Sequence, residues 1–113
     1  MDYKVRFTEQ VRQDLDGIFI YYSTEFSENI AKKVITRLQQ TGNLLMFSPE
    51  GGINFDHKIG YSLYPGNTLR MIVSKQYLLF YLIHEKEVHI LRIINSRTDY
   101  LNQLDHLFQH IQD

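Results

Sequence analysis

The chain has 113 residues, a formal net charge of −1 at pH 7 and no cysteine, and 43% of its residues are hydrophobic. This length and composition fit one globular domain spanning residues 1–113, and they exclude an intrinsically disordered chain. The lack of cysteine excludes disulfides, thiolate zinc sites and cysteine nucleophiles. The near-neutral charge disfavours a protein that binds nucleic acid by charge alone.

We expect no targeting signal, because Met1-Asp2-Tyr3-Lys4 leads straight into mixed residues without an apolar core segment. No apolar run in the sequence approaches the length that a membrane-spanning helix needs. We therefore expect a cytoplasmic protein that has no membrane partner.

The first part of the chain predicts a strand followed by two helices. Residues 3–7 alternate apolar and polar side chains, which is typical of a half-buried strand. Thr8 is placed to cap a helix that ends near Thr24, and Ser27 to cap a second helix that ends between Gly42 and Phe47. Apolar residues recur at helical spacing in the first of these helices, at Val11, Leu15, Ile18, Phe19 and Tyr22. The short connection predicts an antiparallel helical hairpin.

The second part predicts a strand meander and a last helix. A loop at 48–52 precedes residues 53–60, which show no clean period and are expected to be irregular. Strand signals follow at 60–64, weakly, and at 68–73, 77–84 and 88–94. Their connections of about three residues predict antiparallel neighbours. Thr98 or Asp99 then caps a short helix whose apolar side is Leu101, Leu104, Leu107, Phe108 and Ile111.

The fold class is therefore α+β, with the helical hairpin covering one face of an antiparallel sheet. The opposite face is expected to be less covered, and we expect Arg70 and Tyr81 to point to that side. Strict alternation along the last strand places Arg92 on the same side as Val88, Ile90 and Ile94.

The order of several short patterns resembles a known family. Asp14-Leu15-x-x-Ile18 opens the first helix, Leu69-Arg70 and Tyr77-x-x-x-Tyr81 lie in the meander, and Arg92-Ile93-x-x-Ser96-Arg97-x-Asp99 ends it. With the strand and the hairpin that precede them, these patterns resemble the RelE/ParE superfamily of bacterial toxins from type II toxin–antitoxin systems. The resemblance spans essentially the whole chain.

The resemblance implies a small cytoplasmic toxin, neutralised by a cognate antitoxin protein in a toxin–antitoxin hetero-oligomer. ParE-like members poison DNA gyrase and are not nucleases. RelE-like members cut messenger RNA in the ribosome without a metal. Residues 92–99 and the Asp14-Leu15 pattern look closer to the ParE branch, which favours DNA gyrase as the target. The alternatives are a RelE-like ribosome-dependent endoribonuclease and a non-toxic member that retains antitoxin binding.

The candidate site residues depend on which of these functions the chain has. An endoribonuclease would use Arg70 and Arg97 to stabilise the charged phosphorane and Tyr81 to move a proton. For target binding the candidates are Arg70, Arg92, Arg97 and Tyr100, because guanidinium groups bind anions bidentately. The structural alternatives are that Arg70 and Arg92 only extend from a sheet face, and that Arg97 forms a local ion pair with Asp99.

Neither a metal nor a cofactor is expected. His106 and His110 lie four residues apart on the last predicted helix, but no third ligand lies near them in the sequence. The chain also lacks a glycine-rich phosphate loop and a Ser-His-Asp order.

Overall fold

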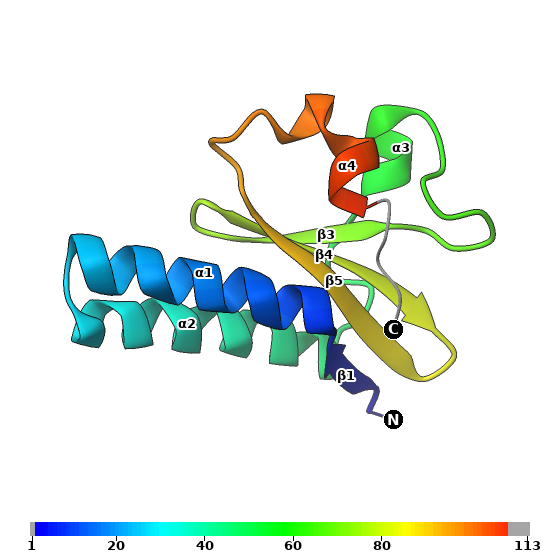
Figure 1. The fold of residues 1–113 in the computed structure, drawn as a ribbon. Helices are drawn as coiled ribbons and strands as arrows, with labels where there is room; N and C mark the ends of the chain where they lie inside the picture. The colour runs from blue at the N-terminus through cyan, green and yellow to red at the C-terminus, as the bar shows by residue number, and fades with distance from the viewer. Residues whose placement is uncertain (1, 109–113) are drawn as a thin grey trace.

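The computed structural model describes residues 2–108 and confirms the predicted α+β order. A strand, a helical hairpin, an antiparallel meander and a short last helix follow one another (Figure 1). The elements are β1 (Lys4–Phe7), α1 (Glu9–Glu25), α2 (Glu28–Asn43), η1 (Leu44–Met46), β2 (Ile53–Asn54), α3 (Phe55–Ile59), β3 (Arg70–Ser74), β4 (Tyr77–His84), β5 (Glu87–Asn95), η2 (Tyr100–Asn102) and α4 (Leu104–Phe108).

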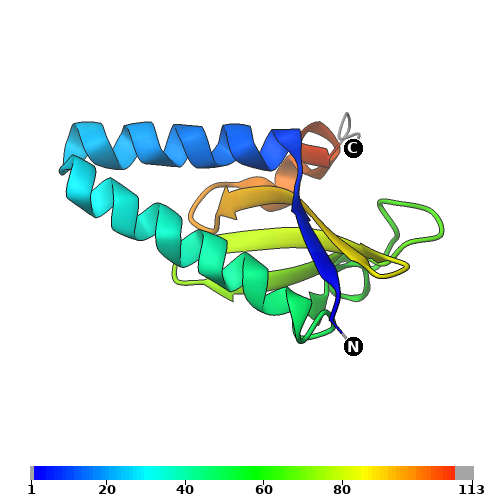
Figure 2. The same cartoon turned by 90° about the horizontal axis from the view of Figure 1, so that it is seen from below.

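Both long helices begin at the predicted caps. The Thr8 side chain accepts a hydrogen bond from the backbone N–H of Val11, and the Ser27 side chain accepts one from Ile30. These bonds satisfy backbone donors that have no partner in the first turn of a helix. Figure 2 shows that the tip of the hairpin, where α1 ends and α2 begins, projects beyond the sheet.

The five strands form one sheet in the order β1-β5-β4-β3-β2. The pairs β5–β4, β4–β3 and β3–β2 are antiparallel, as predicted for the meander, and β1 pairs with β5 in parallel. A parallel pair needs a long crossover. Here that crossover contains the helical hairpin and most of the sheet, which places the first and the last strand side by side.

Each face of the sheet carries its own core, with α1 and α2 over one face and α3 and α4 over the other (Figures 1 and 2). We call these the hairpin face and the α4 face. The buried core of the hairpin face is Val11, Leu15, Val34, Leu38, Leu45, Tyr77, Leu79, Tyr81, Val88, Ile90 and Ile93. The buried core of the α4 face is Phe55, Leu69, Met71, Leu78, Phe80, Leu91, Ile94, Leu104 and Phe108.

A β-bulge in β5 changes which side chains share a face. Tyr81 lies opposite Ile90 and Phe80 lies opposite Arg92, so Leu91 is an extra residue without a cross-strand partner. Ile90 therefore belongs to the hairpin face, whereas Arg92 and Ile94 belong to the α4 face. The prediction that Arg92 shares a side with Val88 and Ile90 is wrong, because alternation does not continue across a bulge.

Residues 53–64 also differ from the prediction. The segment 53–60, expected to be irregular, contains β2 and α3. Residues 60–64 form an irregular connection and not a strand, with only an isolated bridge between Tyr64 and Asn67. Asn54 caps α3 by accepting a hydrogen bond from the backbone of His57, and Gly60 ends the helix with φ of 87°. Phe55 anchors α3 on the α4 face through an edge-to-face contact with Phe80, at 4.9 Å between ring centroids.

The predicted last helix is not continuous. Asp99 precedes the short 3-10 helix η2, and α4 begins separately at Leu104. Leu104 and Phe108 of α4 are buried on the α4 face, whereas Leu101 is exposed. The predicted apolar residue Ile111 lies outside the described residues.

Candidate functional site

Arg92 is held inside the molecule by Asp14. Its Nε and Nη2 atoms donate to the two carboxylate oxygens of Asp14 at 3.0 and 2.9 Å, and Nη1 donates to the carbonyl oxygen of Leu107 at 2.9 Å. Asp14 also accepts from the backbone N–H of Ile93 at 2.9 Å. The side chains of Arg92 and Asp14 are only 17% and 9% exposed. This bidentate pair joins α1, β5 and α4, which explains an arginine within an apolar strand.

Tyr81 and Arg70 hold the loop that precedes β2. The Tyr81 hydroxyl donates to the carbonyl oxygen of Pro49 at 2.8 Å and accepts from the N–H of Gly52 at 2.9 Å. Arg70 donates to the carbonyl oxygen of Gly52 at 3.3 Å and lies 3.8 Å from the exposed carboxylate of Glu50. The loop at 48–52 is therefore fixed against the sheet by two side chains from β3 and β4.

The backbone at Gly52 approaches Tyr81 so closely that only glycine fits. A Cβ atom at this position would lie 2.6 Å from the carbonyl oxygen of Met71 and 2.7 Å from the Tyr81 hydroxyl. Tyr81 is 0% exposed, and burial raises the pKa of its hydroxyl. The hydroxyl therefore stays neutral with its proton donated within the protein, a poor arrangement for proton transfer to a ligand.

Arg70 and Tyr81 do not face the less covered side, so that prediction is wrong. Tyr81 lies in the core of the hairpin face, and Arg70 is its cross-strand partner on the same face. The reason is that β4 alternates without a break, so Tyr81 shares the hairpin face with Tyr77 and Leu79, and the regular register between β3 and β4 places Arg70 beside it.

Arg97 lies beyond the end of β5, in a tight turn that Asn95 organises. The Asn95 side chain accepts from the backbone N–H of Arg97 at 2.9 Å, and the Thr98 hydroxyl donates to the Asn95 carbonyl at 2.7 Å. Arg97 is exposed, and within residues 2–108 its guanidinium forms no ion pair, so the predicted pair with Asp99 is not found. The turn fixes the backbone while the guanidinium remains available.

Beside Arg97 lies a groove between α1 and the ends of β4 and β5, with a volume of about 290 Å³. We call it the Arg97 groove. Its lining is Gly17, Ile18, Tyr21, Tyr22, Gln76, Tyr77, Ile93, Asn95 and Arg97. Gln76 donates to the Tyr22 hydroxyl at 2.6 Å, and the Tyr77 hydroxyl lies 3.4 Å from the same oxygen. These bonds join α1 to the β3–β4 turn and hold the walls of the groove in place.

The structure brings Arg70 and Tyr81 together but places Arg97 apart from them. Arg70 lies opposite Tyr81, whereas Arg97 follows Asn95, which lies opposite Tyr77. Four residues along a strand separate these two places by about 13 Å. Tyr100 packs its ring against Phe80 at 6.2 Å, on the α4 face.

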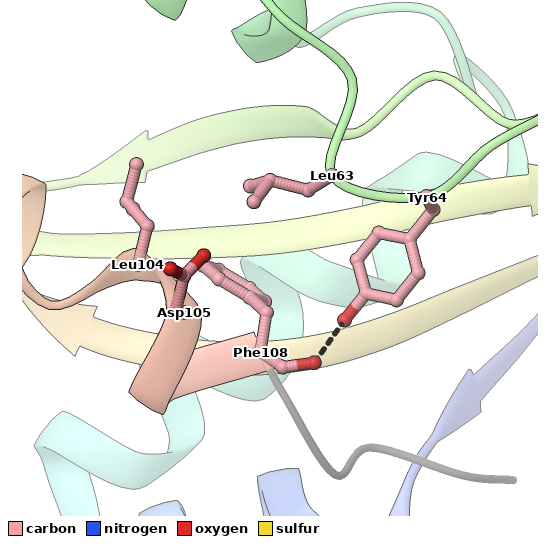
Figure 3. Close-up of a pocket in the computed structure, with 5 residues that line it drawn as sticks. All are labelled: Leu63, Tyr64, Leu104, Asp105 and Phe108. Atoms are coloured by element: carbon pink, nitrogen blue, oxygen red, sulfur yellow. Dashed lines mark hydrogen bonds between the residues drawn. The ribbon is translucent and has the colours of Figure 1, made fainter.

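A second hollow lies between α4 and the loop before β3 (Figure 3). It is lined by Leu63, Tyr64, Leu104, Asp105 and Phe108. The Tyr64 hydroxyl donates to the carbonyl oxygen of Phe108 at 3.0 Å, and burial raises the pKa of Tyr64 to about 12. Among residues 2–108, the polar side chains that line this hollow are the Asp105 carboxylate and the Tyr64 hydroxyl, which is already hydrogen-bonded. This lining favours a role in attaching α4 rather than in chemistry.

Within residues 2–108 no three histidine, aspartate or glutamate side chains lie close enough to form a metal site. His110, the partner of His106 in the predicted pair, lies outside the described residues. No helix in the same part of the chain is both long enough and apolar enough to cross a membrane.

Sequence reasoning missed two residues that the structure makes prominent. Asp14 was recognised only as part of a family pattern, although a carboxylate on the inner face of a helix signals a buried cation partner. Gly17 in the middle of the first helix was not used, although glycine is unfavourable there.

Comparisons with known proteins agree with this geometry. The family model described as "ParE toxin of type II toxin-antitoxin system, parDE" matches residues 5–100. No curated protein matches the chain. Among solved structures, a chain of the "Chromosomal ParDE TA system from P. aeruginosa" has 20% sequence identity and a TM-score of 0.68. The match covers 84% of this chain and 97% of that chain, and it shows a shared fold. Because the family model covers most of the sequence, this chain belongs to the ParE toxin family of type II toxin–antitoxin systems.

Proposed function

We propose that this ParE-family chain inhibits growth by binding DNA gyrase, that it is not a nuclease, and that a cognate antitoxin neutralises it in a hetero-oligomer. The observation that carries the first two parts is the arrangement of the arginines. Arg92 and Arg70 make internal contacts, and Arg97 has none to a carboxylate in the described residues. An exposed guanidinium that pairs with no carboxylate in residues 2–108, beside an aromatic groove, suits the recognition of a protein.

Metal-free RNA cleavage makes different demands on geometry. It needs a proton-transfer group and charge stabilisers around one phosphate. Tyr81 is buried with its hydroxyl bonded to Pro49 and Gly52. Arg70 and Asn95, the residue two before Arg97, lie at levels of the sheet that are about 13 Å apart along the strands. This spacing argues against the endoribonuclease alternative.

Large exposed apolar side chains support a protein partner that covers much of the surface. Leu44 in η1 and Phe47 just after it are 61% and 67% exposed. Ile20 in α1 and Phe26 at the hairpin tip are 63% and 61% exposed. Monomeric proteins seldom expose such side chains in groups. An antitoxin that wraps both regions would bury on the order of 2,000 Å² or more.

The target is tested by a supercoiling assay with purified gyrase, run beside a translation extract that contains a reporter message. We expect loss of supercoiling and an intact message. Cleavage of the message, abolished by Arg70→Ala or Arg97→Ala, would instead establish the ribosome-dependent endoribonuclease. Normal growth after induction, with gyrase unaffected, would establish a non-toxic member.

The antitoxin is tested by co-expression with the product of the neighbouring reading frame. We expect restored growth and co-purification of the two chains in a stable complex. Restored growth without a complex would contradict direct neutralisation.

A further inference from the structure

Gly17 has no role in packing within the described part of this chain. It lies in the middle of α1, where glycine destabilises a helix by about 0.5–1 kcal/mol relative to alanine. Apart from its chain neighbours and the backbone of its own helix, a Cβ atom at this position would meet no heavy atom within 4 Å. The missing side chain instead leaves space in the wall of the Arg97 groove. A partner that approaches α1 closely at this point would account for the glycine.

The groove combines one cation with apolar and aromatic walls. Arg12, Arg70 and Arg92 each face a carboxylate, whereas Arg97 faces none within residues 2–108. Ile18, Tyr21 and Ile93 line the same groove as Arg97. A carboxylate would satisfy Arg97 bidentately, and an adjacent apolar side chain would fit over Gly17.

The charge pattern selects a protein segment over a nucleic acid. A polyphosphate chain is held by several cations in a row, but among residues 2–108 Arg97 is the one cationic side chain that lines this groove. A volume of about 290 Å³ has room for one or two side chains. The Tyr22–Gln76 bond keeps the walls apart before the partner arrives, which lowers the cost of ordering on binding.

We propose that the Arg97 groove receives a segment of DNA gyrase in which an acidic residue is next to an apolar one. The carboxylate pairs with Arg97, and the apolar side chain packs over Gly17 between Tyr21 and Ile93. This inference rests on the proposed function, because it names the chemistry of the segment that the toxin recognises.

The test compares groove variants with matched controls in two assays, growth arrest after induction and inhibition of supercoiling. Arg97→Glu places like charges together and is expected to weaken both activities by at least about 10-fold. Arg97→Lys keeps the charge but loses the bidentate fork, so its loss is smaller. Gly17→Leu fills the groove without disturbing the fold and is expected to lose activity like Arg97→Glu. The controls Arg12→Gln and Gln13→Leu change exposed positions of α1 outside the groove and keep full activity.

Each result decides the proposal. Full activity of Arg97→Glu and Gly17→Leu, with folding confirmed by circular dichroism, would overturn the groove but leave gyrase as the target. If the wild-type chain arrests growth without affecting gyrase, gyrase is not the target. If both groove variants then also lose growth arrest, the groove binds a different target protein. A wild-type chain inactive in both assays overturns both proposals. Equal losses in the groove variants and the controls would also overturn the groove.

Discussion

Arg92 and Arg97 lie five residues apart in the chain, yet their surroundings give them opposite roles. Arg92 forms two hydrogen bonds with Asp14 and one with the carbonyl oxygen of Leu107. Arg97 is exposed, has its backbone fixed by Asn95, and has no carboxylate partner in the described residues. Two residues of α1 account for the difference. Asp14 places a carboxylate beside Arg92, whereas Gly17 lines the groove that Arg97 also lines.

This contrast shows how one family pattern can serve stability and recognition together. A buried arginine is tolerated only where its charge is paired and its donors are satisfied. An exposed one at the end of a rigid strand costs the fold little and can be used for binding. Substituting these residues one at a time tests whether Arg92 serves the fold and Arg97 serves binding.

The largest expected effect is on Arg92. Arg92→Ala leaves the Asp14 carboxylate without its cation and the Leu107 carbonyl without its donor, so we expect the free energy of unfolding to fall by about 3 kcal/mol. Urea denaturation measures it, and Arg97→Ala is the matched control, expected to change stability by less than about 0.5 kcal/mol. Equal losses in the two variants would remove the contrast.

A smaller effect is expected at Tyr81. Tyr81→Phe removes the hydroxyl that bonds Pro49 and Gly52, and should lower the free energy of unfolding by about 1–2 kcal/mol. Gyrase inhibition should be unchanged at equal folded fraction, because the loop lies at the other end of the sheet from Arg97. The exposed Tyr61→Phe is the control. Loss of toxicity with normal stability would give Tyr81 a direct functional role.

The smallest effect is a gain at Gly17. Gly17→Ala should raise the free energy of unfolding by about 0.5–1 kcal/mol, because alanine suits a helix better and its Cβ meets nothing. Thermal or urea unfolding measures the gain. A loss of stability would mean that Gly17 is there for the fold and not for a partner.

The sequence was sufficient for the elements with strong local signals. Thr8 and Ser27 cap the two long helices as predicted, and the short connections after Ser74 and His84 gave the antiparallel meander. These features depend on residues close together in the chain. Segment 53–60 was missed because its helix is short and is stabilised mainly by burial of Phe55 against Phe80.

The faces of the sheet were harder to predict than its strands. The bulge at Leu91 is set by the register between β4 and β5, which no pattern within β5 reveals. It moves Arg92 to the side of α4 and leaves Tyr81 under the hairpin. Arg92 pairs with Asp14, which lies 78 positions away in the chain. The different roles of Arg92 and Arg97 therefore could not be predicted from the sequence and became evident only from the fold.

The most direct test of this contrast is the exchange of the arginine side-chain Nε–H protons with water, followed by nitrogen-15 NMR of the free chain. Signals are assigned with the Arg92→Lys and Arg97→Lys variants. Because Arg92 Nε donates to Asp14 at 3.0 Å, its proton should exchange slowly, while that of Arg97 should exchange as fast as in an unfolded chain. Slow exchange at Arg97, or fast exchange at Arg92, would contradict the assignment of one arginine to the fold and the other to a partner.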